Sequence, residues 1–256
     1  MQYALDRVLT VGGTYAATNS KKGITAGDVA FLADQVTDPS LSFTAETEEI
    51  VDARNNVVMI LENGRGATFG ASNAFFNTQI LAAQTGGKVE DAAGATFTKY
   101  DILTLDASKK ATLTAEPTED ATFKVYTLSK DNSLTTAAAT TGTADGGTIT
   151  VEAGAEGDRI LAVYTAKAPS GEKIVALADG ANELMNVTAE VLLRELCDEE
   201  LYYAFIVMKG KLSGEAEWSM TRDGNHAFEI RCLPSYCADP RQLLEVIIVK
   251  GEDMVA

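Results

Sequence analysis

The chain has 256 residues, of which 46% are hydrophobic and 23% are charged. This balance is typical of a globular protein, and the length suits one large β domain or two smaller ones. The formal net charge of −16 argues against nucleic-acid binding through the phosphates, although an acidic wall can guide a polyanion by repelling it. No apolar run is long enough to cross a bilayer and the first residues lack a signal-peptide pattern, so we expect no membrane contact.

The N-terminal third begins with strand signals at residues 3–9, which Gly12-Gly13 is expected to interrupt. The polar segment 14–27 contains Lys21 and Lys22 and is expected to be a solvated loop, or an arm lying on a neighbour in an assembly. Residues 29–32 form a short apolar strand, and Asp38-Pro39 predicts a turn.

Residues 41–87 form the most readable stretch, predicted as strand, turn, strand, turn, strand and helix. Phe43, Ala45 and Thr47 alternate with polar residues, so one face of the first strand can be buried. The run 57–61 is entirely apolar, which predicts a strand covered on both faces. The turn residues of segment 52–56 separate these strands, and Asn63-Gly64 predicts a second turn.

A flanking α-helix is predicted at about residues 72–85. Ser72 can cap its first turn, and Gly86 can adopt the left-handed conformation just after its end. Phe76, Ile80 and Ala83 share one face at helical spacing. We interpret this helix as a cover for one open end of a sheet.

From residue 104 to 167 the composition shifts to Thr, Ala, Gly and Asp, with short alternating strands between turn signals. This spacing is typical of a small antiparallel sandwich. We therefore predict a β core made of residues 1–103 and 168–256 and a candidate inserted module at 104–167.

Strand signals are dense again from residue 187 to 250. The hairpin EAEWSMT-RDGN-HAFEIRCL is predicted to place Trp218 opposite Ile230 and Glu217 opposite Arg231, around a three-residue loop of Asp223, Gly224 and Asn225. Gly210–Gly214 is expected to end the preceding strand, and residues 243–249 form a final strong strand.

No catalytic motif is present in the sequence. The single histidine, His226, has no orienting partner near it in the sequence. Cys197, Cys232 and Cys237 lack metal-ligand spacing and are expected to be free thiols. We expect no enzyme activity, no cofactor and no metal. A paired carboxylate site remains an alternative, because such a site leaves no local motif.

The order of these elements resembles the major tail tube proteins of tailed bacteriophages. The resemblance is carried by DVAFLAD, LSFTAETEEIVDARNNVVMIL, SNAFFNTQILAAQTG and the hairpin ending in EIRCL, and it covers residues 29–87 and 187–250. It implies a mainly β subunit, an antiparallel sandwich or barrel with one flanking helix. The region 104–167 is similar to the immunoglobulin-like modules that phage structural proteins carry, and the alternative is that it supplies extra strands of one larger domain.

The resemblance also implies a function. Subunits would form homohexameric rings with an inner β-barrel, and the stacked rings would be a passive conduit for viral DNA. Implied partners are the tape-measure protein and the tail-terminator or sheath proteins. The implied location is the virion tail, assembled in the host cytoplasm.

Two sets of residues follow from this interpretation. The candidate bore-lining carboxylates are Glu46 and Glu48, with Glu215, Glu217 and Glu229 as second choices. The candidate inter-ring contacts are Lys21, Lys22, Asn55 and Asn56. The alternatives are a capsid decoration or other head–tail structural protein, a cell-surface β-sandwich adhesin, and a carboxylate-based hydrolase.

Overall fold

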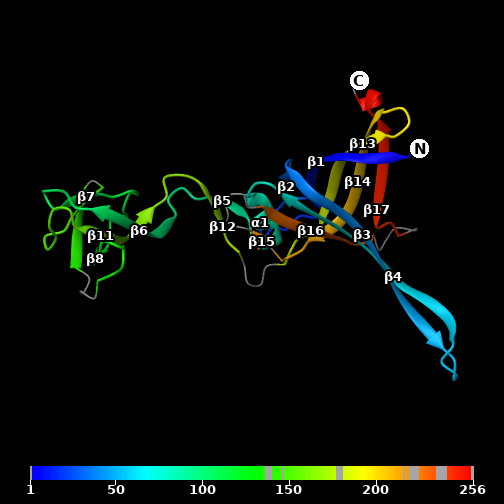
Figure 1. Ribbon diagram of the computed structural model, residues 1–256, viewed down its shortest axis with the longest axis horizontal. Helices are drawn as coiled ribbons and strands as arrows, with labels where there is room; N and C mark the ends of the chain where they lie inside the picture. The colour runs from blue at the N-terminus through cyan, green and yellow to red at the C-terminus, as the bar shows by residue number, and fades with distance from the viewer. Residues whose placement is uncertain are drawn as a thin grey trace. The chain divides into compact units, whose positions relative to one another are not determined.

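The computed structural model describes residues 2–135, 140–145, 147–176, 181–215, 217–218, 225–234 and 241–254. It divides into two compact units, residues 1–89 with 174–256 and residues 90–173. Both are built from antiparallel strands, so the mainly β fold with one α-helix is confirmed (Figure 1). The predicted insertion 104–167 lies inside the second unit, which also contains the strand before it.

The first unit is one large sheet with the strand order β2-β1-β13-β14-β16-β4-β3, in which β15 also pairs with β16 and β17 with β14. Its strands are β1 (Tyr3–Tyr15), β2 (Val29–Ala33), β3 (Val36–Val51), β4 (Val57–Asn73), β13 (Met185–Glu195), β14 (Leu201–Leu212), β15 (Glu217–Trp218), β16 (His226–Cys232) and β17 (Leu244–Lys250). A short 3₁₀ helix, η1 (Gly251–Met254), follows the last strand. Among the described strands the sheet stays open, since β2 and β3 end the order and do not pair with each other.

One face of this sheet carries the core. The register aligns Val187 with Met208 and Ile230 with Phe69, so apolar side chains from neighbouring strands gather on the same side. Helix α1 (Thr78–Gln84) adds Ile80 to the same cluster of buried residues. The helix therefore packs on the core face of the sheet.

Two glycine positions predicted to break strands lie inside them. A Cβ on Gly13 would come within 2.5 Å of the Phe31 ring, and a Cβ on Gly210 would come within 2.4 Å of the Arg231 carbonyl oxygen. β1 and β14 continue through these positions because glycine lets the neighbouring strand approach closely. The predicted interruption of β1 at Gly12-Gly13 is therefore wrong, whereas β14 ends at Leu212, inside the predicted range 210–214.

The central element is one long hairpin of β3 and β4. The predicted turn at 52–56 is confirmed: Asn55 has a positive φ of 64°, and Asp52 Oδ1 accepts the backbone N–H groups of Arg54 and Asn56. The second predicted turn is wrong. The register pairs Glu46 with Gly64 and Thr47 with Glu62, so Asn63 is the extra residue of a β-bulge and β4 runs on to Asn73.

The helix begins later than predicted. Its N-cap is Asn77, whose side-chain oxygen accepts the backbone N–H groups of Gln79 and Ile80. Ser72 belongs to β4, where it pairs with Ala227 of β16. The backbone N–H and C=O groups at this position are used in strand pairing instead of in the first turn of a helix. The left-handed conformation of Gly86, with φ 65°, is confirmed.

The hairpin of β15 and β16 has a different register from the prediction. Trp218 lies opposite His226 and Glu217 opposite Ala227. A shift by an even number of residues keeps every side chain on its face, so the alternation that guided the prediction fits both registers. Ser219, Met220, Asp223 and Gly224 lie outside the described residues.

The second unit contains a six-stranded sheet with the order β6-β11-β8-β9-β10-β7. These strands are β6 (Thr96–Thr104), β7 (Lys110–Thr112), β8 (Phe123–Leu128), β9 (Thr140–Asp145), β10 (Thr148–Thr150) and β11 (Arg159–Lys167). It has a core of its own. A short ribbon of β5 (Val89–Asp91) and β12 (Glu172–Ile174) lies where the chain enters and leaves this unit.

Asp101, Thr114 and Tyr164 form a buried hydrogen-bond network that connects separate strands and loops of the second unit. Tyr164 Oη donates to Asp101 Oδ2 at 2.9 Å, and the same carboxylate accepts the backbone N–H and hydroxyl of Thr114 at 2.9 and 2.5 Å. Burial alone would raise the pKa of Asp101, but these hydrogen bonds and Lys99 hold that pKa below its usual value. The pKa of Tyr164 rises to about 12 through burial and the adjacent carboxylate.

Candidate assembly interface

The end of the β3–β4 hairpin projects beyond the body of the first unit (Figure 1). β4 pairs with β16 through residues 68–73, so residues 57–67 have β3 as their one neighbour among the described strands. The apolar run 57–61 is a strand as predicted, but the coverage on both faces is wrong for the single chain. Val58 is 66% exposed and Ile60 59% exposed. Phe43, expected on a face that can be buried, is 64% exposed.

The two strands of this projecting end differ in character. Val57–Leu61 of β4 has no charge, whereas the part of β3 that pairs with it begins with Glu48 and Glu49 before Ile50 and Val51. Glu48 lies opposite Leu61, and Glu49 lies opposite Ile60. Next to the turn both strands are apolar, since Ile50 lies opposite Met59 and Val51 opposite Val57, and the acidic residues of β3 come just before this apolar end.

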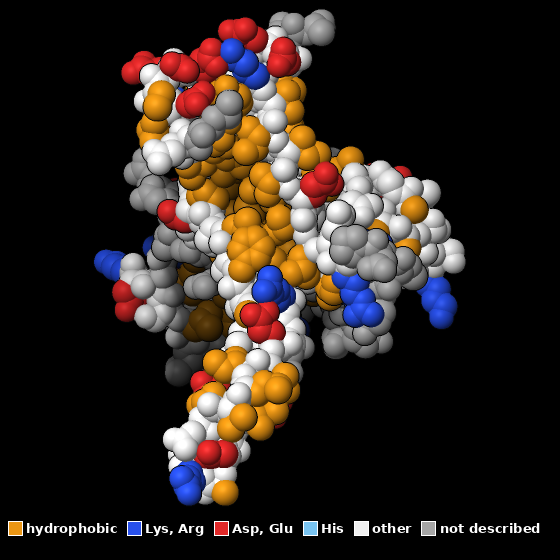
Figure 2. All heavy atoms as spheres, turned by 90° about the vertical axis from the view of Figure 1, so that its right-hand side faces the viewer, with side chains coloured by type: hydrophobic (Ala, Val, Ile, Leu, Met, Phe, Trp, Pro, Cys, Tyr) orange, Lys and Arg blue, Asp and Glu red, His pale blue; other side chains and the backbone are white. Residues whose placement is uncertain are grey.

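A second exposed apolar element is β17. It pairs with β14, and no other described strand borders its outer edge. Val246, Ile247 and Ile248 are 49%, 42% and 44% exposed, although successive side chains point to opposite faces. Figure 2 looks at the side of the first unit where β17 lies and shows hydrophobic side chains over this side and along the projecting hairpin.

The predicted bore-lining carboxylates fall into three groups. Glu46, Glu48 and Glu229 lie on the same face of the sheet, opposite the core face, because Glu46 pairs with Gly64 and Glu229 with Gly70. Glu229 also forms an ion pair with Arg231 at 2.9 Å. Glu215 and Glu229 line a shallow groove of about 550 Å³ on this side. Glu217 lies in β15, and its side chain lies outside the described atoms.

The predicted inter-ring residues come from two places. Asn55 and Asn56 form the exposed turn at the end of the projecting hairpin. Lys21 is exposed, but Lys22 folds back onto its own chain, where its Nζ donates to the Ala181 carbonyl at 2.7 Å and pairs with Glu183 at 3.1 Å. Lys22 therefore holds the loop against the segment before β13.

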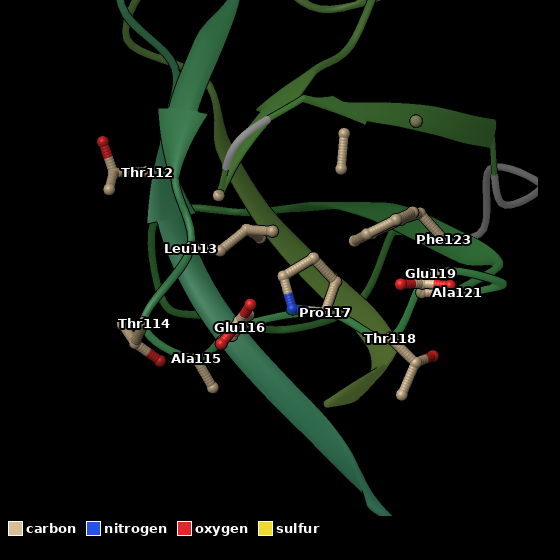
Figure 3. Close-up of a pocket in the computed structure, with 13 residues that line it drawn as sticks. Thr112, Leu113, Thr114, Ala115, Glu116, Pro117, Thr118, Glu119, Ala121 and Phe123 are labelled. Carbon is tan, nitrogen blue, oxygen red and sulfur yellow. The ribbon is translucent and has the colours of Figure 1, made fainter. Parts of the chain in front are cut away.

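A pocket with a volume of about 970 Å³ lies in the second unit. Figure 3 shows the side chains of Leu113, Pro117 and Phe123 pointing into it, while those of Thr112 and Thr114 point away. Its lining mixes these apolar side chains with polar residues such as Glu116, Thr118 and Glu119. Within the described part of the chain, no cluster of three or more His, Cys, Asp or Glu side chains could hold a metal ion, and no helix has the length and hydropathy of a membrane span.

His226 is a buried core residue. Its Nε2 donates to Gln84 Oε1 at 2.8 Å, and its ring stacks on Phe76 at a centroid distance of 5.8 Å. Burial lowers its pKa, and its Nδ1 has no hydrogen-bond partner among the described residues. With no exposed surface, this imidazole joins the helix to the sheet and cannot touch a substrate. Cys197 and Cys232 are free thiols as predicted, and Cys237 lies outside the described residues.

The model of the YomU/Tube protein family matches residues 21–239. The chain belongs to this family. The match spans both compact units, and the family name points to a tube protein, in line with the resemblance of the sequence to tail tube proteins. No curated protein matches the sequence.

Sequence reasoning missed the exposure of the apolar strands. The run at 57–61 is predicted as a strand covered on both faces, and residues 243–249 as a final strong strand. A signal was present in the β3–β4 pair: an apolar strand facing a strand with three carboxylates, Glu46, Glu48 and Glu49, has no consistent inner face.

Proposed function

We propose that this protein is a structural subunit of a phage tail tube, which assembles with copies of itself into stacked homohexameric rings. The observation that carries the proposal is the projecting hairpin, whose apolar residues are exposed in a member of the YomU/Tube family. It is not an enzyme, and it resides in the virion tail after assembly in the host cytoplasm.

The energetics favour self-association over a solitary chain. Full burial of one aliphatic side chain contributes about 1.5–3 kcal/mol, whereas association itself costs about 4–15 kcal/mol. Several apolar residues of the hairpin must therefore be buried together. An exposed apolar strand edge is an aggregation hazard in a monomer, and a closed ring of subunits removes it.

The acidic residues fit a channel for DNA. In a ring, the face that carries Glu46 and Glu48 would line the bore, and its negative charge would keep the passing polyanion from binding. Viral DNA would transit without specific contacts. The tape-measure protein and the tail-terminator or sheath proteins are the partners expected at the bore and at the ends or outer surface of the tube.

Electron microscopy of the purified protein over a range of concentrations tests the proposal. We expect negatively stained rings or tubes that become longer and more numerous as concentration rises. Monomers at every concentration would overturn it, and discrete trimers would favour the capsid decoration alternative.

The bore assignment has its own test. We expect the Glu46→Gln/Glu48→Gln variant to assemble into tubes whose bore has a weaker negative potential, measured by the entry of a small cationic probe into the lumen. The structure of the tube is the control, and both side chains on its outer surface would refute the assignment.

A further inference from the structure

Apart from the two-residue strand β15, the first unit leaves five strand segments without a second neighbour among its described strands. They are the outer edge of β2, the first half of β1, the outer edge of β3, residues 57–67 of β4 and the outer edge of β17. Each such edge presents backbone N–H and C=O groups that can pair with another chain. Only edges that are neither covered nor blocked by charged residues or proline can pair with a strand of another subunit.

Three of the five edges are protected. Asn77 Nδ2 donates to the Leu32 carbonyl at 2.8 Å, so the segment before the helix occupies the edge of β2. The first half of β1 carries Asp6 and Arg7. The edge of β3 carries Pro39 and the glutamates at 46, 48 and 49. Charged residues and proline on an edge strand discourage pairing with another strand.

The remaining two edges have no such protection and share a second property. Residues 57–61 of β4 and 246–249 of β17 are continuous apolar runs, VVMIL and VIIV. A strand that is apolar on both faces belongs in the interior of a sheet with both faces covered. Neither run has this environment in the single chain, since Val58, Ile60, Val246 and Ile248 are each at least 44% exposed.

We propose that residues 57–61 of β4 pair with residues 246–249 of β17 in a second copy of this chain. The inference rests on the proposed function and names the contact through which the subunits join. The occupant is another copy because each run supplies what the other lacks: a neighbouring strand and apolar side chains on both faces. Within one chain the two runs lie apart, since the hairpin end points away from β17 (Figures 1 and 2).

The symmetry of the assembly follows from this contact. The two surfaces are different parts of the chain, so the contact is heterologous, and each subunit uses β4 toward one neighbour and β17 toward the other. A heterologous contact closes into a ring when the rotation between subunits permits. A contact between identical surfaces would instead stop at a dimer.

Disulfide cross-linking in assembled tubes tests the pairing. In a Cys197→Ser background, one cysteine is placed in β4 and one in β17, giving nine double variants from Val58, Met59 or Ile60 with Val246, Ile247 or Ile248. Every position is exposed in the single chain, so each variant should melt like the parent under reducing conditions. A disulfide requires Cα atoms about 4.4–6.8 Å apart, so it forms only between directly neighbouring residues.

We expect at least one variant to give, on oxidation, a non-reducing gel ladder from dimer up to the ring. We would also mix two variants that each carry one introduced cysteine, one in β4 and the other in β17. This mixture should give dimers and nothing larger, because each chain can then form one intersubunit disulfide. The control pair Glu48→Cys with Ile247→Cys, which uses the β3 edge, should stay uncross-linked.

The other outcomes separate the two proposals. Normal tubes without a cross-link in any of the nine variants would overturn the β4–β17 pairing and leave the tube function standing. Dimers alone from the double variants would show an isologous contact and overturn it too. A parent protein that never assembles would overturn the tube function, and the pairing with it.

Discussion

At the residue scale, the buried polar residues of the described chain include His226 in the first unit and Asp101 in the second. Each is held by a residue distant in sequence, Gln84 at 2.8 Å and Tyr164 at 2.9 Å. A buried polar group that loses its partner destabilises the fold, so these two contacts should be measurable.

The stability of the first unit should fall in mild acid because of His226. Burial holds its folded-state pKa below the ordinary 6.5, so the unfolded chain gains a proton first as the pH decreases. The stability present above pH 6.5 is therefore lost as the pH falls through the lower folded pKa. Urea midpoints at pH 7.5 and 5.5 should differ more for the parent than for His226→Gln. If the urea midpoint changed equally with pH in the parent and in His226→Gln, the loss of stability in acid would not originate from His226.

Removing the Tyr164 hydroxyl should destabilise the second unit. Tyr164→Phe deletes a hydrogen bond to a buried carboxylate, which contributes about 1.5–3 kcal/mol. Hydrogen exchange of the β6 and β11 amides should accelerate accordingly. Tyr126→Phe, at a half-buried tyrosine of β8, is the matched control and should have little effect. An unchanged exchange rate in Tyr164→Phe would show that the network is dispensable.

At the element scale, the projecting hairpin joins a closed turn to an exposed strand. Its turn is held by Asp52, whose pKa is lowered by the backbone and side-chain hydrogen bonds of Asn56. The apolar strand that follows the turn pairs only with β3 among the described strands, and Val58 and Ile60 remain 66% and 59% exposed. The hydrogen bonds of the turn are thus all formed within the subunit. In the proposed assembly, the exposed apolar residues of the strand are buried by a second subunit.

Charges placed on this strand should abolish assembly without unfolding the subunit. Val58→Asp/Ile60→Asp changes two exposed side chains, so the unfolding free energy should change by less than about 0.5 kcal/mol. Carboxylates inside a subunit contact would remain unpaired, which is strongly unfavourable. Sedimentation velocity should show monomers where the parent forms large particles. Glu46→Gln/Glu48→Gln is the control that should still assemble, and normal tubes from the aspartate variant would exclude this strand from the contact.

At the scale of the whole molecule, the two units have separate cores that share no residue. The chain enters and leaves the second unit side by side, since Ala92 N–H donates to the Gly171 carbonyl at 2.9 Å. The first unit contains both unprotected edges. Its folding and assembly should therefore be independent of the second unit.

Deleting the second unit should leave a chain that assembles. Replacement of residues 93–170 by Asn-Gly joins two residues that are already hydrogen-bonded, and this pair of residues favours the tight turn of a two-residue hairpin. We expect cooperative thermal unfolding of the shortened chain and tubes in electron micrographs. The full-length protein is the reference, and a shortened chain that folds but stays monomeric would place part of the assembly surface in the second unit.

The amino-acid sequence by itself determined the β class, the turn at 52–56, the existence of one amphipathic helix, the apolar run at 57–61 and the strong strand at 243–249. These features depend on alternation and turn chemistry, which act between residues close in the chain. The structure alone decided that β4 is a single strand through Asn63, that the helix begins after Asn77, and that Trp218 faces His226. Such features depend on pairing between distant segments, and an even shift in register leaves the alternation pattern unchanged. The exposure of Val58 and Ile60 belongs to the same class, because an apolar run has the same sequence whether its cover comes from its own chain or from a neighbour.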